Sequence, residues 1–112
     1  MQHLLGTNIV SVLSGKVILA QFNGAGGCTV IIRSGEYQIM YCHVSPNFLV
    51  YNGQNVNQGD LIANVGPKNI YGFSNNYFKD ANGSPTNGST TGPHLHLSIK
   101  KNGVQVDPLS FF

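Results

Sequence analysis

Two histidines separated by one residue are the feature of this 112-residue sequence most suited to chemistry. His94 and His96 lie in the run Thr91-Gly92-Pro93-His94-Leu95-His96-Leu97. In a β-strand, residues i and i+2 point to the same face, so both imidazoles would project together while the two leucines turn to the core. Imidazole is the commonest metal ligand in proteins and also titrates near neutral pH. The pair therefore predicts metal binding or proton transfer.

A third histidine, His43, closes a predicted strand in the run Tyr41-Cys42-His43-Val44-Ser45. Alone it would be an ordinary exposed histidine, and its importance depends on whether the fold brings it near His94 and His96. We expect it to share their face of the sheet, with His43 and His94 able to reach one substrate atom over about 3 Å.

Short strands and tight turns must position these side chains. No ten-residue stretch has the apolar spacing of a helix without Gly or Pro, whereas β-branched runs recur between Gly-containing turns. The expected strands are 9–12, 16–22, 28–33, 37–43, 61–65, 94–100 and 104–106. Ser34-Gly35 predicts a hairpin, and Gly53 and Gly59 predict two tight turns. The expected fold is all-β: a single antiparallel domain of two sheets that spans residues 1–112.

The stretch 67–92 interrupts this pattern. It is rich in Asn, Gly, Ser, Thr and Pro, and at this length it far exceeds the usual connection of about 4–6 residues. Its aromatic residues predict that the loop packs partly over the domain; a mobile surface insertion is the alternative. With the three histidines it would wall a groove floored by the sheet.

Composition excludes several classes of protein. Charged residues make up 9% of the chain, the formal net charge is +2, and no basic cluster extends beyond Lys100-Lys101, so no nucleic-acid partner is expected. No apolar run approaches the roughly 18 residues of a membrane span. The N-terminal residues do not have the charged start of a signal peptide. A polar, uncharged surface is typical of extracellular or virion-borne β proteins.

Cys28 and Cys42 are the only cysteines. Their separation in sequence does not say whether their Cβ atoms meet. We interpret them as small buried hydrophobic residues rather than a disulfide, and expect them on neighbouring strands of the predicted hairpin.

Taken together, the motifs resemble the lysostaphin/LytM-type peptidoglycan metallopeptidases over nearly the whole chain. The matching motifs, in chain order, are Gly6-Thr7, Gly15-Lys16-Val17, Tyr41-x-His43, Gly53-Gln54-x-Val56-x-x-Gly59-Asp60-x-Ile62, Thr91-Gly92-Pro93-His94-Leu95-His96 and Asp107-Pro108. The long loop before Thr91 is similar to that of family members carried on bacteriophage tail tips. The resemblance implies extracellular or virion-associated action on peptide cross-links of bacterial peptidoglycan, with other enzyme or phage tail domains as further partners.

The resemblance also implies a site. The family holds one zinc with two His and one Asp; His96 matches a metal ligand, and His43 and His94 match the two non-ligand histidines that assist the attacking water and stabilise the tetrahedral intermediate. No other cofactor-binding residue is implied.

The family's other two ligands come from a His-x-x-x-Asp motif upstream of Gly6-Thr7, and counting back places that His before residue 1. His3 is in the wrong register, and Thr7 stands where an Asp is needed. Two explanations are open. The chain is a trimmed piece of an active zinc endopeptidase, or it is a degenerate relative, a non-catalytic wall-binding or phage tail structural module. A lipoyl- or biotinyl-type carrier is disfavoured because no lysine has the required hairpin setting.

Overall fold

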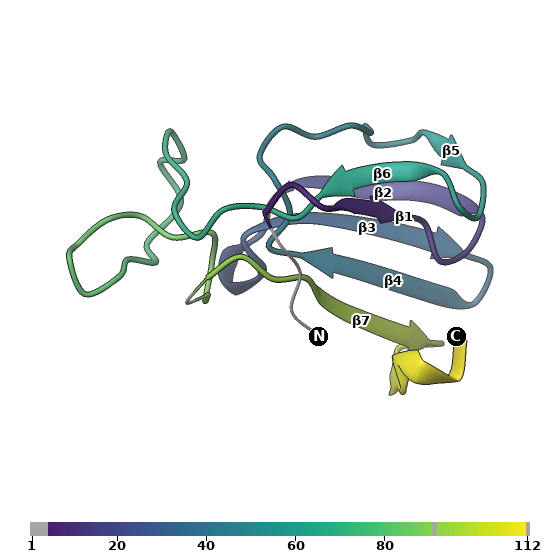
Figure 1. Cartoon of the computed structure of the whole chain (residues 1–112). Coiled ribbons are helices and arrows are strands. Elements are labelled where there is room, and N and C mark those ends of the chain that lie inside the picture. The colour runs from purple at the N-terminus through teal and green to yellow at the C-terminus, as the bar shows by residue number, and fades with distance from the viewer. Residues whose placement is uncertain (1–4, 91, 112) are drawn as a thin grey trace.

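The computed structural model describes residues 5–90 and 92–111, which form antiparallel β-strands joined by turns and loops. In chain order the elements are β1 (Asn8–Val10), β2 (Gly15–Phe22), the 3₁₀ turn η1 (Gly24–Gly26), β3 (Cys28–Ser34), β4 (Tyr37–Cys42), β5 (Asn55–Val56), β6 (Leu61–Asn64), β7 (His96–Lys101), β8 (Val104–Val106) and the 3₁₀ turn η2 (Pro108–Phe111). The larger sheet has the order β5-β2-β3-β4-β7-β8, and β1 pairs with β6 in a smaller sheet (Figure 1). The predicted all-β, two-sheet antiparallel fold is confirmed.

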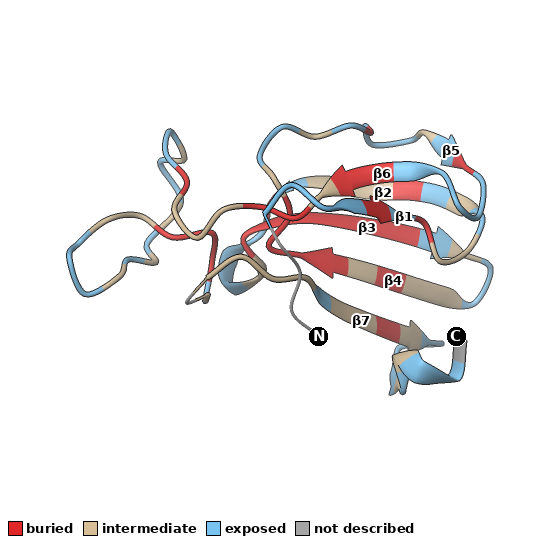
Figure 2. Cartoon of the chain, viewed as in Figure 1, coloured by how far each residue is buried: buried red, intermediate tan, exposed pale blue. Residues whose placement is uncertain are grey.

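The core lies between the two sheets. Ile32, Ile39 and Ile99 are cross-strand neighbours on β3, β4 and β7, and all three are fully buried. Ile9 and Ile62 contribute from the smaller sheet, so that buried positions gather where the sheets face each other (Figure 2). Successive side chains of a strand point to opposite faces, so Val30 and Ile32 of β3 both reach the core cluster.

The hairpin of β3 and β4 forms as predicted. Its turn holds Gly35 at φ +59°, a conformation that glycine adopts without steric cost. Cys28 and Cys42 lie on these neighbouring strands, and both are buried free thiols. Burial raises the pKa of the Cys28 thiol to about 11, so it stays protonated at neutral pH. The interpretation of the cysteines as small core residues is confirmed.

Six of the seven predicted strands differ in their boundaries from the observed ones, and three of the differences affect the site or the pairing. The strand predicted over 94–100 begins at His96, and the strand predicted over 37–43 ends at Cys42. Both changes leave a site histidine just outside a strand. The strand predicted over 9–12 is β1, which ends at Val10 and pairs with β6 across more than 50 residues of sequence.

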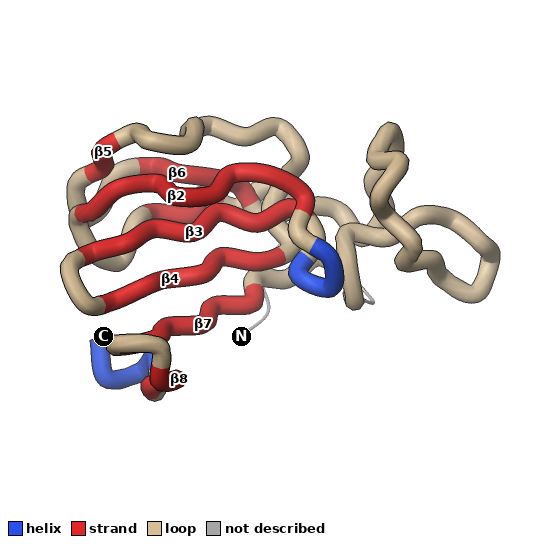
Figure 3. Tube along the Cα trace, turned by 180° about the vertical axis from the view of Figure 1, so that it is seen from behind, coloured by secondary structure: helices blue, strands red, loops and turns tan. Residues whose placement is uncertain are grey.

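The loop 67–92 projects beyond the end of the larger sheet where β4 finishes and β7 starts (Figures 1 and 3). Packing holds this loop, because Ile70 is buried and Phe73 stacks on Phe22 with ring centroids 5.5 Å apart. Tyr71 and Tyr77 are exposed. The prediction that this loop packs partly over the domain is confirmed. Within the described ranges, no helix is long and apolar enough to cross a membrane.

Candidate active site

His43 follows the last residue of β4 and turns the chain out of the sheet. Its φ is +62°, a left-handed conformation that costs a non-glycine residue roughly 1–2 kcal/mol. Backbone bonds on both sides hold it there: its N–H donates to Gly26 O at 2.8 Å, and Gly66 N–H donates to its carbonyl at 3.0 Å. Non-glycine residues held in such conformations cluster at functional sites.

His43 is 6% exposed, and its ring makes one buried hydrogen bond. Nδ1 lies 2.7 Å from the carbonyl oxygen of Asn87, and because a carbonyl can only accept, Nδ1 must carry the proton. Burial lowers the pKa of the His43 imidazole below its ordinary 6.5, the bond to Asn87 opposes this, and the charges of His94 and His96 add to the lowering. The ring is therefore neutral at pH 7, with a lone pair on Nε2.

His94 is oriented by the turn that precedes β7. Its Nδ1 lies 2.9 Å from Gly92 O and 3.2 Å from Thr90 Oγ1, and the Thr90 hydroxyl itself donates to Gly92 O at 2.7 Å. Nδ1 again faces a carbonyl, so the neutral ring has its lone pair on Nε2. A turn, rather than strand alternation, thus directs this side chain.

The three histidines form one cluster. The ring centroid of His43 lies 4.9 Å from that of His94 and 6.4 Å from that of His96, which is exposed at the first residue of β7. The expected proximity of His43 to both is confirmed; their chemical roles stay predictions. Two adjacent imidazoles, each with Nδ1 bonded to a carbonyl, can accept a proton from a nucleophile and donate one to a leaving group.

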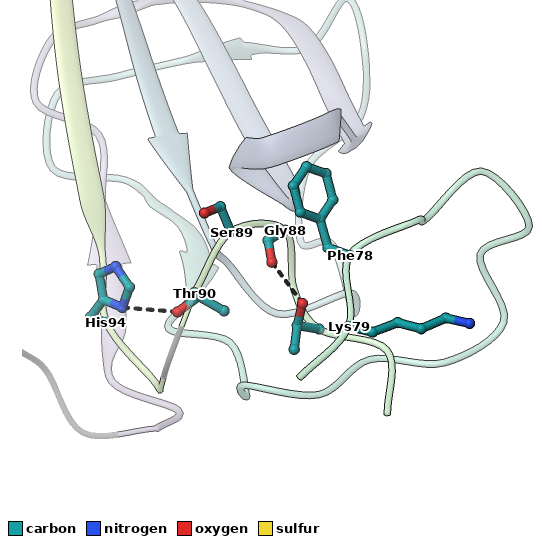
Figure 4. A pocket seen from close by; sticks show the side chains of 7 residues that line it. Phe78, Lys79, Gly88, Ser89, Thr90 and His94 are labelled. Carbon is teal, nitrogen blue, oxygen red and sulfur yellow. Dashed lines mark hydrogen bonds between the residues drawn. The ribbon is translucent and has the colours of Figure 1, made fainter. Parts of the chain in front are cut away.

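Cavities open on two sides of the cluster. One of about 290 Å³ lies between His94 and the long loop, where Phe78, Lys79 and Ser89 line it (Figure 4). In that view the Lys79 side chain extends away from His94. The other cavity, of about 820 Å³, reaches from His96 along β1 to η2 and is mostly apolar. The loop is therefore one wall of the site.

The described residues do not fit a catalytic zinc, which takes about three protein ligands. Across 5–90 and 92–111, no group of three or more His, Cys, Asp or Glu side chains is arranged to hold a metal ion. Asp80 and Asp107 instead accept hydrogen bonds from backbone N–H groups of their own turns. His3 lies outside the described residues.

Two residues that orient the histidines were not found by sequence reasoning. Asn87 is one of many asparagines in a polar loop, and no sequence signal distinguishes it. Thr90 lies next to the recognised Thr91-Gly92-Pro93-His94 run, so its position close to that motif was the available signal.

The sequence pattern that defines Peptidase family M23 matches residues 2–108, which include the three histidines of the cluster and both sheets. The chain belongs to Peptidase family M23. An uncharacterized metalloprotease of Haemophilus influenzae is similar to this M23 chain, with 33% identity over 107 residues. That match covers 94% of the M23 chain and 18% of the relative, so the chain spans less than a fifth of that relative's length.

Solved structures agree with this M23 fold. A zinc containing peptidase from Vibrio cholerae has 27% identity and a TM-score of 0.71, covering 94% of this chain and 26% of its own. The catalytic domain of lysostaphin from Staphylococcus simulans has 24% identity and a TM-score of 0.73, covering 98% and 73% respectively. The lysostaphin match supports the shared fold.

Proposed function

We propose that this chain is a peptidase domain that acts on the peptide cross-links of bacterial peptidoglycan, in an extracellular or virion-associated setting. The observation that carries the proposal is the cluster of His43, His94 and His96 at the strand ends of an M23 fold. In this proposal His43 and His94 move protons and His96 is a metal ligand.

The hydrogen bonds of the cluster support the two proton-transfer roles. Each Nδ1 is bonded to a carbonyl, so each ring points its Nε2 lone pair away from that bond, where it can act as a base. The lowered pKa of His43 keeps that base unprotonated at neutral pH. An extended peptide can lie against the rings, since a cavity adjoins His94 and another adjoins His96.

Zinc binding by His96 would require further ligands, because no group of three or more His, Cys, Asp or Glu side chains in the described ranges is arranged to hold a metal. The same observation favours a second function, a non-catalytic wall-binding module in which the histidines hydrogen-bond the peptide without cleaving it. The two functions differ in whether zinc is retained and whether new amino groups appear.

The deciding experiment combines zinc content with a cell-wall assay. Untagged protein is purified at neutral pH, its zinc is measured by elemental analysis before and after zinc titration, and release of amino groups from purified cell walls is followed. We expect His43→Ala and His94→Ala to lower hydrolysis about 100-fold or more, as loss of a general base does. Ser98→Ala, two residues from His96 on β7, is the control and should retain activity.

Stoichiometric zinc with hydrolysis supports the peptidase. Wall binding that depends on the histidines, without zinc or hydrolysis, supports the binding module and overturns the peptidase. Neither binding nor hydrolysis after zinc titration overturns both.

A further inference from the structure

Asn87 is a fully buried polar residue that joins the long loop to the sheets. Its side-chain Oδ1 accepts the N–H of Cys28 at 2.7 Å, and its Nδ2 donates to the carbonyl of Val44 at 2.9 Å. Its backbone N–H donates to Lys68 O at 2.8 Å. The remaining group, its carbonyl, is the acceptor for His43 Nδ1 at 2.7 Å. The residue therefore links both ends of the loop to β3, to His43 and to Val44, which follows His43 in the chain.

Three glycines close the space around Asn87. A Cβ at Gly66 would lie 2.6 Å from its Nδ2, and a Cβ at Gly27 would overlap its Oδ1 and its carbonyl. Gly88, the next residue, leaves no room for a Cβ beside the backbone of Ala25 and Gly27. Real Cβ contacts are not this close, so each position requires glycine. Packing and hydrogen bonds together prevent Asn87 from rotating, and its carbonyl has a fixed direction.

A fixed carbonyl has a chemical consequence for the ring it faces. A neutral imidazole carries its proton on either nitrogen, and the hydrogen bond made by one nitrogen decides the state of the other. A carbonyl 2.7 Å from Nδ1 selects the Nδ1–H form of His43 and leaves Nε2 as the acceptor. A ring without that carbonyl would populate the Nε2–H form too, which cannot accept a proton at Nε2.

We propose that Asn87 is a positioning residue: its side-chain amide anchors the end of the loop 67–92, so that its carbonyl holds His43 in the Nδ1–H tautomer. This inference deepens the proposed function, because the tautomer matters for catalysis only where His43 acts as a base. The loop is then part of the histidine site's support and not only a wall of its groove.

The test reads the tautomer directly by NMR. Long-range ¹H–¹⁵N spectra of the ¹⁵N-labelled full chain are recorded at a pH where His43 is neutral. We expect the unmodified chain to show a protonated Nδ1, an unprotonated Nε2 and a slowly exchanging Nδ1–H signal. In Asn87→Ala we expect loss of that slow signal and a mixture of tautomers.

Asn69→Ala is the matched control. Asn69 is in the same loop, but its side chain bonds Asp80 and Pro85 within the loop and not the sheet. We expect this variant to keep the tautomer of the unmodified chain. Methyl signals of the buried isoleucines report whether each variant is folded.

Two results would overturn the inference. One is an Nε2–H form of His43 in the unmodified chain, which needs no variant and decides the question even where Asn87→Ala does not fold. The other is a folded Asn87→Ala variant with an unchanged tautomer. A chain that shows the expected tautomers but does not hydrolyse cell walls would overturn the peptidase alone, so the two failures are distinguishable.

Discussion

At the scale of single residues, His43 combines a strained backbone, a buried ring and a fixed hydrogen bond. Its left-handed φ redirects the chain from β4, and its ring then lies between Asn87 and the other two histidines. Buried rings and fixed hydrogen bonds are common in proteins, whereas a left-handed φ is uncommon for a non-glycine residue. Their combination on one side chain indicates that the surrounding structure maintains the position of this imidazole against a local conformational cost.

The burial of His43 predicts a pH dependence of stability in the metal-free chain. Its pKa is lowered in the folded state, so the unfolded chain binds the proton more readily as pH falls below 6.5. The stabilising contribution is therefore complete above pH 6.5 and is lost as pH falls through the lower, folded-state pKa. The slope from one such group cannot exceed about 1.4 kcal/mol per pH unit.

We expect His43→Gln to flatten this part of the curve when the free energy of unfolding is measured in urea from pH 7.5 to 5. His96→Gln is the control and should keep most of the slope, because burial of His43 is the largest cause of its shift. Equal slopes for His43→Gln and the unmodified chain would contradict the prediction.

Residue types and motifs were sufficient to predict the histidine cluster but not the residues that orient it. His43, His94 and His96 are conspicuous because imidazoles are scarce and chemically distinct. Asn87 acts through packing and through a backbone carbonyl, and neither depends on a pattern that a sequence displays. The conformation of the loop that carries Asn87 had to be known first.

At the scale of elements, turn residues predicted which neighbouring strands form a hairpin but not which distant strands pair. The hairpin of β3 and β4 has its turn signal in Ser34-Gly35, between the strands it joins. The partner of β1 is β6, more than 50 residues away, and no local residue specifies that choice. The start of β7 was also missed, because the bonds among Thr90, Gly92 and His94 replace strand geometry just before it.

The junction of β6 with the long loop predicts a specific sensitivity at Gly66. A Cβ there would overlap the Val44 carbonyl and lie 2.6 Å from Asn87 Nδ2. We expect Gly66→Ala to destabilise the fold by about 1–3 kcal/mol, the range for overpacking, and to shift the imidazole signals of His43.

Gly53→Ala is the matched control for that prediction. Gly53 has open space around it but a φ of +93°, so alanine should cost about 1–2 kcal/mol through backbone strain alone. Urea unfolding measures both losses, and NMR separates their causes, since Gly53→Ala should leave the His43 signals in place. Unperturbed His43 signals in Gly66→Ala would show that this glycine is not coupled to the site.

At the scale of the whole molecule, the two sheets differ in size, with two and six strands, and the smaller sheet covers only part of the larger one. The smaller sheet lies over β2 and β3, and in Figure 1 no labelled strand lies in front of β4 and β7. The apolar cavity of about 820 Å³ occupies this region and reaches His96. Within the described residues, β1 pairs only with β6. Composition could not have predicted this hollow, because it depends on how far one sheet extends over the other.

An open apolar cavity of this size predicts that the folded chain binds an environment-sensitive apolar dye such as ANS. Val10 lines the cavity and is half exposed, and Val104 on β8 is similarly exposed but is not among the lining residues. Replacing a contacting valine by a polar residue removes on the order of 1 kcal/mol of apolar contact, so Val10→Asn should weaken dye binding several-fold. Fluorescence titration under native conditions measures this, with Val104→Asn expected to bind as the unmodified chain does. Equal affinity in the two variants would place the dye elsewhere and would mean that the cavity beside His96 is closed to small apolar molecules in solution.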